Sequence, residues 1–90
     1  MVRRRFLIAS LLLATALATA GKLDEAIPQY QEALRYRPDN PATHLNLGRA
    51  LAARGQTEEA IRHFTEALRL KPDLAEARQA LQSLEAAKPK

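Results

Sequence analysis

Apolar and small side chains recur at helical spacing in five stretches of this chain, and a glycine or a proline separates each stretch from the next. Apolar residues at positions i, i+3, i+4 and i+7 form one face of a helix, whereas a half-buried strand alternates at every second residue. The pattern therefore predicts an all-α fold. We expect helices over about 7–20, 24–37, 42–54, 57–70 and 74–87.

The same pattern recurs along the chain with a period of 34 residues. From Gly21 to Asn40, 10 of 20 positions are identical to the residue 34 places later. A period of this size is typical of stacked helical repeats. We expect one domain over 1–90, with repeat 1 over about 7–40, repeat 2 over 41–74 and an incomplete third unit.

Local signals place the ends of the helices in the repeats. Thr57 is the expected N-cap of the second helix of repeat 2, and Glu58 and Glu59 follow in its first turn, where carboxylates favour the positive end of the helix dipole. Pro72 ends this helix because proline has no backbone N–H to donate. In repeat 1, Pro28 lies inside the corresponding helix, and we expect a late start or a mild kink there.

Small residues indicate how the paired helices meet. Gly48 on the first helix of repeat 2, and Ala60 and Ala67 on the second, allow the two backbones to approach closely. We therefore expect an antiparallel helical hairpin. The corresponding packing residues of the first helix of repeat 1 are Leu13, Ala14 and Leu17.

The third unit, about 74–87, is a single helix with one apolar stripe. Asp73 and Glu76 form an expected capping pair at its start. Gln82 and Glu85 replace small and apolar residues of the repeat, which is typical of the polar cap that ends a solenoid. Residues 1–5 form a basic arm and residues 88–90 a frayed tail. The stripe consists of Leu74, Ala77, Ala80, Leu81 and Leu84.

From about residue 7 to 87 the chain resembles the tetratricopeptide repeat family. The resemblance implies an α-α superhelix, or solenoid, of two antiparallel helical hairpins and a C-terminal capping helix. In repeat 2 the matching residues are His44, Leu47, Gly48, Leu51, Gly55, Ala60, Phe64, Ala67 and Pro72. In repeat 1 they are Leu13, Ala14, Leu17, Gly21, Ala26, Tyr30, Ala33 and Pro38.

In that family, the first helices of the repeats line a concave groove that binds peptide segments of other proteins. The resemblance thus implies a non-enzymatic interaction scaffold with a protein or peptide partner. Family members that clamp a C-terminal carboxylate use Lys, Arg and Asn in the groove, and only Asn46 approaches that pattern. The main residues carried over to the groove are Ile8, Leu11, Thr15, Leu45, Arg49, Ala52, Glu76 and Gln79, with Ala18, Thr19, Ala42, Ala53 and Ser83 beside them.

The first 20 residues have a second interpretation. Arg3 to Arg5, an apolar run and Ala18-Thr19-Ala20 match the three parts of a secretory signal peptide. Cleavage after Ala20 would leave the helix over 24–37 without its partner, so we favour a first helix, and with it a cytoplasmic protein, over an exported one. The uncharged run of 16 residues, 6–21, is shorter than the roughly 20 residues needed to span a bilayer.

Charge argues against a nucleic-acid ligand. The net charge is +4, but the arginines of the basic arm and the lysines of the tail supply +5 of it, which leaves −1 for residues 6–87. A phosphate-binding face needs basic residues gathered on the folded body. We therefore expect no nucleic-acid partner, and contact with a membrane only through the N-terminal arm.

The sequence offers little for catalysis or cofactor binding. It contains no cysteine, and its two histidines, His44 and His63, have no ligand or nucleophile spaced to work with them. We expect His44 to pack in the hairpin and His63 to lie on the surface. No metal, cofactor or catalytic residue is predicted, so we expect the chain not to be an enzyme.

The first helix lacks a preceding polar cap. Ile8, Leu11 and Leu12 should then form an exposed apolar strip, for which a homodimer through the first helices is the expected outcome. The alternative is that the chain is a fragment of a longer array and binds nothing by itself.

Overall fold

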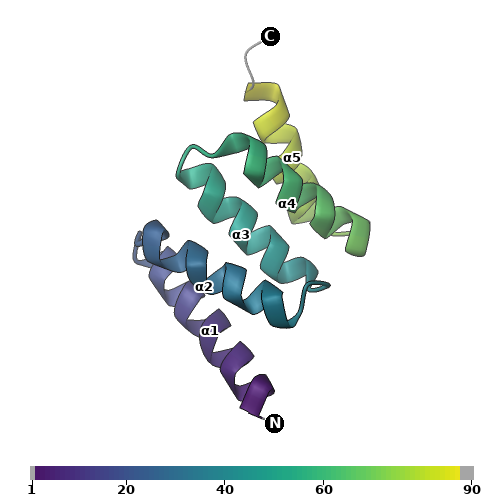
Figure 1. The fold of residues 1–90 in the computed structure, drawn as a ribbon. Helices are drawn as coiled ribbons and strands as arrows, with labels where there is room; N and C mark the ends of the chain where they lie inside the picture. The colour runs from purple at the N-terminus through teal and green to yellow at the C-terminus, as the bar shows by residue number, and fades with distance from the viewer. Residues whose placement is uncertain (1, 88–90) are drawn as a thin grey trace.

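The computed structural model describes residues 2–87, with side chains from residue 11 onward. Over this range the chain forms five helices: α1 (Val2–Thr19), α2 (Leu23–Tyr36), α3 (Pro41–Ala53), α4 (Thr57–Leu70) and α5 (Ala75–Ala87). Figure 1 shows them stacked in chain order, with the two ends of the chain at opposite ends of an elongated molecule. The expected all-α solenoid of two hairpins and a final helix is confirmed.

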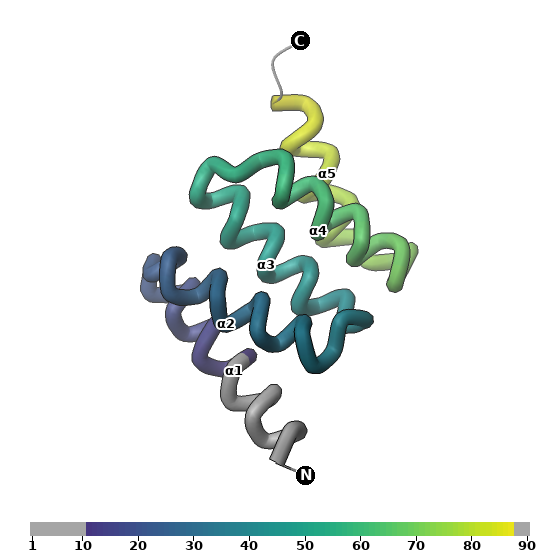
Figure 2. Tube along the Cα trace, viewed as in Figure 1, coloured from purple at the N-terminus to yellow at the C-terminus, as the bar shows by residue number. Residues whose placement is uncertain are grey.

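The turns alternate between the two edges of the stack. In Figure 2 the α1–α2 and α3–α4 turns lie on one side, and the α2–α3 and α4–α5 turns lie on the other. Gly21 and Gly55 occupy equivalent places, with φ of 81° and 83°, in the left-handed region that glycine adopts without steric cost. Lys22 N–H donates to the Leu17 carbonyl and, 34 residues later, Gln56 N–H donates to the Leu51 carbonyl, at 2.8 and 2.9 Å. Both hairpins therefore close with the same C-terminal cap.

The core is a row of small and large side chains between the paired helices. Ala26, Ala60 and Ala67 are fully buried, and Tyr30 and Phe64 place their rings at equivalent positions of α2 and α4. A Cβ atom added to Gly48 would lie 2.7 Å from Phe64 Cε1. The missing side chain of Gly48 therefore makes room for the Phe64 ring, which is 1% exposed.

Three local expectations are wrong. Thr57 is the first residue of α4, and the cap position belongs to Gln56, whose side chain makes no capping hydrogen bond. The helix around Pro28 does not start late, because α2 already begins at Leu23. Leu13 is 48% exposed, since no element of the described chain covers that side of α1.

One cap was not predicted. Asn40 Oδ1 accepts hydrogen bonds from the backbone N–H groups of Ala42 and Thr43 at 3.1 and 3.4 Å, and Pro41 is the first residue of α3. A proline at this place loses nothing, because the first N–H of a helix has no partner within it. The start of α3, which leads into the concave side, is thus fixed by three consecutive signals.

Candidate functional site

A groove of about 370 Å³ opens between α1, α2 and α3. Its floor is Tyr30 of α2, a residue of which only 2% is exposed. Alanines form much of the walls, and they leave the space open because a methyl group does not reach across it. The lining residues are Thr15, Ala18, Thr19, Leu23, Tyr30, Asn46, Arg49, Ala50 and Ala53.

Hydroxyl groups are grouped at the α1 side of the groove. The Tyr30 hydroxyl lies 3.5 Å from Thr15 Oγ1, at the outer limit of a hydrogen bond. The Thr19 hydroxyl donates to the Thr15 carbonyl at 2.8 Å. Thr15 and Thr19 are both exposed, so the oxygens that remain open can meet a ligand.

The α3 side carries an amide and a guanidinium. Asn46 is half-buried, and within the described residues its carboxamide has no side-chain hydrogen bond. Arg49 lies one turn further along α3 and is the one charged residue among those that line the groove. Its Nη2 donates to Glu76 Oε2 of α5 at 2.7 Å. The carboxylate expected to cap α5 beside Asp73 is therefore bound to α3.

The residues predicted for the groove fall into three groups. Thr15 and Arg49 line it, together with Ala18, Thr19 and Ala53. Leu45 is 5% exposed and lies in the core, and Leu11 is half-buried against the core, so neither offers an open surface. Ile8 lies outside the residues whose side chains are described. The remaining residues, Ala42, Ala52, Glu76, Gln79 and Ser83, lie at least partly exposed on α3 and α5.

Sequence reasoning missed four lining residues, Leu23, Tyr30, Asn46 and Ala50. Tyr30 was assigned to the core, and it is both a core residue and the floor of the groove. The available signal was the exchange of the repeat-2 aromatic, Phe64, for a tyrosine, because a buried tyrosine hydroxyl normally finds a polar partner. In this protein that partner is a groove residue, Thr15.

The two histidines meet, which the sequence did not indicate. His44 is 8% exposed as expected, but His63 is half-buried and places its Nδ1 3.0 Å from His44 Nδ1. His44 Nε2 lies 2.8 Å from the Pro38 carbonyl, and a carbonyl only accepts, so His44 carries its hydrogen on Nε2. The Nδ1 of a neutral His44 is then the acceptor, and His63 Nδ1 donates to it. The pair joins α4 to α3 and to the turn after α2.

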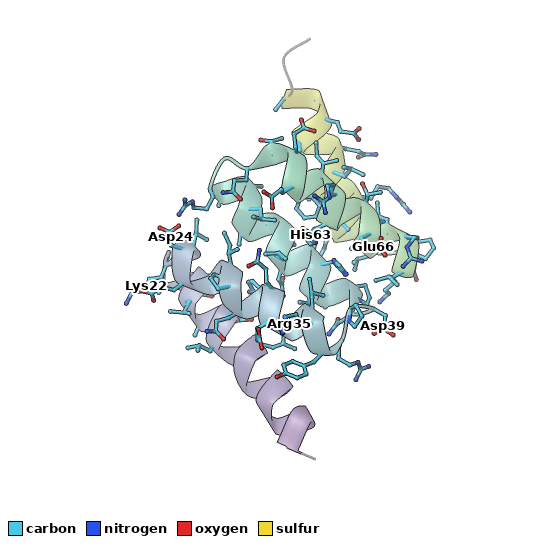
Figure 3. All side chains as sticks on the ribbon, viewed as in Figure 1. Lys22, Asp24, Arg35, Asp39, His63 and Glu66 are labelled. Carbon is cyan, nitrogen blue, oxygen red and sulfur yellow. The ribbon has the colours of Figure 1, made fainter. Side chains whose placement is uncertain are left out.

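Figure 3 labels His63 and Glu66 on α4. Burial lowers the pKa of His63 below its ordinary value of 6.5, and the positive charges of His44 and Arg62 lower it further, while Glu59 and Glu66 act in the opposite direction. Within the described part of the chain, no group of three or more His, Cys, Asp or Glu side chains is placed to hold a metal ion.

The exposed face of α1 is apolar. Leu12 is 67% exposed and Leu13 48%, the two largest values among the exposed large hydrophobic residues of the described chain. The predicted strip of Ile8, Leu11 and Leu12 is thus corrected, because Leu11 packs against the core and Leu13 takes its place at the surface. None of the helices in the described range combines the length and the hydropathy needed to cross a bilayer.

Comparison with known proteins gives a consistent match. The model of the tetratricopeptide repeat matches residues 11–75. A solved structure of a MamA mutant superposes with a TM-score of 0.83 at 26% identity, over 89% of this chain and 58% of that one. The chain therefore spans less than two thirds of the length of that structure. No curated protein sequence matches.

A second solved structure is the first TPR of Spaghetti (RPAP3) bound to an HSP90 peptide. It covers 92% of this chain and 93% of its own, with 20% identity and a TM-score of 0.46. At that score the two backbones differ too much for any detail to be carried from one to the other.

Proposed function

This chain belongs to the tetratricopeptide repeat family, and we propose that it is a scaffold that binds an extended polypeptide segment of another protein in the groove between α1, α2 and α3. The observation that carries the proposal is the groove itself. It is concave, it is lined by the first helices of both repeats, and its floor is an aromatic ring.

The chemistry of the walls suits a peptide backbone. An extended segment has N–H and C=O groups that are not paired within the segment, and they need partners when water leaves. The Asn46 carboxamide can donate and accept, and the hydroxyls of Thr15 and Thr19 can do the same. The alanine walls leave space for one apolar side chain of the ligand above Tyr30.

We include in this proposal that the chain acts without catalysis. Proteins of this family are generally non-catalytic scaffolds. Both imidazoles, the side chains most often used in acid–base catalysis, are engaged with each other and with the Pro38 carbonyl. Their role in this structure is to join α3 and α4.

A blocking substitution tests the groove. Ala53 is exposed at the end of α3, so Ala53→Trp should fill the groove without disturbing the core. Arg62→Trp, on the exposed side of α4, adds the same bulk away from it. Peptides selected from a display library against the parent should bind at least tenfold more weakly to Ala53→Trp and unchanged to Arg62→Trp, by fluorescence anisotropy. Failure to select any saturable binder, or equal binding to both variants, would refute the proposal.

We also propose a second role, self-association through the exposed face of α1. Leu12 and Leu13 support it, because side chains of this size at 67% and 48% exposure favour a partner surface. The outward side of α5 carries polar residues such as Gln82 and Glu85, so stacking α1 of one copy on α5 of the next would pair an apolar surface with a polar one. A two-fold pairing of α1 with α1 is the better match.

A further inference from the structure

Arg49 belongs to two surfaces at once. Its side chain lines the groove, yet its guanidinium is held at 2.7 Å by Glu76, which lies on α5 outside the residues that line the groove. The other lining residues carry no charge, so this guanidinium decides the electrostatic character of the groove. While Glu76 holds it, that charge is largely neutralised.

We propose that Glu76 is an internal competitor for Arg49, and that the natural ligand is a peptide segment whose acidic side chain takes the guanidinium from Glu76 while a neighbouring apolar side chain lies over Tyr30. This inference rests on the proposed function. It adds the chemical class of the ligand and a contact of the fold that opposes binding.

The position of Glu76 is suited to this role. It is in the first turn of α5, where the helix dipole favours a carboxylate, so the competitor is held close to Arg49. Arginine presents several N–H donors in a planar fork, and it can turn from one carboxylate to another without losing its charge. A ligand carboxylate therefore replaces a bond of the same kind.

The exchange is feasible because the resident pair is exposed. The side chains of Arg49 and Glu76 are 50% and 62% exposed, and an ion pair this open to water is weak. A ligand that fills the groove excludes water from its own pair with Arg49, and such a pair is stronger than an exposed one. Removing the competitor should thus raise affinity by roughly 1.5- to 5-fold, the range that corresponds to exposed ion pairs.

The test uses peptide pools of defined charge. Three labelled, N-acetylated octapeptide pools combine apolar positions with one variable residue: Glu with an amidated C-terminus, Gln with an amidated C-terminus, and Gln with a free C-terminal carboxylate. Binding of each pool to the parent, Glu76→Gln, Arg49→Gln and Glu85→Gln is measured by anisotropy. Glu85→Gln makes the same change of charge on the same helix, away from Arg49.

The parent should prefer the Glu pool to the amidated Gln pool. Glu76→Gln should raise affinity for the Glu pool alone, Glu85→Gln should change nothing, and Arg49→Gln should abolish the preference. Weaker or equally changed binding of both amidated pools by Glu76→Gln would refute the competitor, as would a preference confined to the free C-terminal carboxylate. If the pools bind equally but Ala53→Trp still blocks them, the groove stands and this inference fails. If no pool binds any folded variant, both fail.

Discussion

At the scale of single residues, Gly48 and Phe64 show how one missing side chain shapes the core. The Phe64 ring fills the space above Gly48, and a Cβ atom there would lie 2.7 to 3.0 Å from three ring atoms. The sequence indicated close packing at Gly48 because of its place in the repeat. It did not show that an aromatic ring, and not the opposing backbone, fills that space, because the ring orientation depends on the whole hairpin.

Gly48→Leu should therefore destabilise the protein by about 1 to 3 kcal/mol or more through overpacking. Gln82→Leu, at the equivalent place of the exposed side of α5, should cost little. Thermal melts followed by circular dichroism compare the two variants with the parent. Equal losses of melting temperature would show that the 34-residue alignment does not describe the packing.

His63 should make the stability depend on pH. Its pKa in the folded protein is below the ordinary 6.5, chiefly through burial, with His44 and Arg62 adding to the shift and Glu59 and Glu66 opposing it. The unfolded chain therefore binds a proton at a higher pH than the folded one. This contribution is fully present above 6.5 and is lost as the pH falls below it.

The variant His63→Gln removes this titration and keeps an N–H donor for His44. Free energies of unfolding from urea titrations, measured above and below pH 6.5, should fall less steeply with acidification in the variant than in the parent. An unchanged slope would mean that the burial of His63 does not affect its titration. The pairing itself could not be predicted, because the two histidines are 19 residues apart and meet only when α3 and α4 are packed.

At the scale of elements, the repeat period predicted the helices well. The expected ranges 24–37 and 42–54 differ by one residue at each end from α2 and α3. This accuracy has a physical cause, since glycine and proline stop helices by backbone geometry alone. Side-chain caps were predicted poorly, because Thr57 and Glu76 each had another place to go once their neighbours were packed.

Helix α1 should be required for the stability of α2. Ala26, Tyr30 and Ala33 of α2 are at most 2% exposed. A chain that begins at Gly21 would open this side to water, and burial of one large side chain contributes about 1.5 to 3 kcal/mol. We expect such a chain to lose cooperative melting, as measured by circular dichroism and calorimetry.

The same variant bears on the signal-peptide interpretation. A truncated chain that melts as cooperatively as the full one would show that α1 is dispensable. Mass spectrometry of the protein from its native host then decides whether residues 1–20 are retained. A mature chain starting at Gly21 would contradict the first-helix interpretation.

At the scale of the whole molecule, the apolar face of α1 predicts association. The parent should be a dimer at tens of micromolar by light scattering, and the double variant Leu12→Gln with Leu13→Gln should be monomeric, because both side chains are exposed. Tyr36→Gln, which changes the next most exposed large hydrophobic residue on another helix, is the control. A monomeric parent, or a double variant that still dimerises, would exclude this interface.

The groove could be predicted only in part. Helical periodicity places Thr15 and Arg49 on the concave side, since it fixes which face each residue occupies. The floor is different, because Tyr30 lies on a second helix and reaches the groove only where α1 and α3 leave space between them. Whether an inward side chain ends in the core or at the base of an opening depends on that spacing.

The stacking of helices in chain order has a kinetic consequence. Each helix packs chiefly on its neighbours in the sequence (Figure 1), so few contacts require the closure of a long loop. Chains with such local contacts fold in microseconds to milliseconds. They also open from their ends, where a helix has one neighbour and not two. Amide hydrogens should therefore exchange fastest in α1 and α5 and slowest in α3, whose buried residues are flanked on both sides.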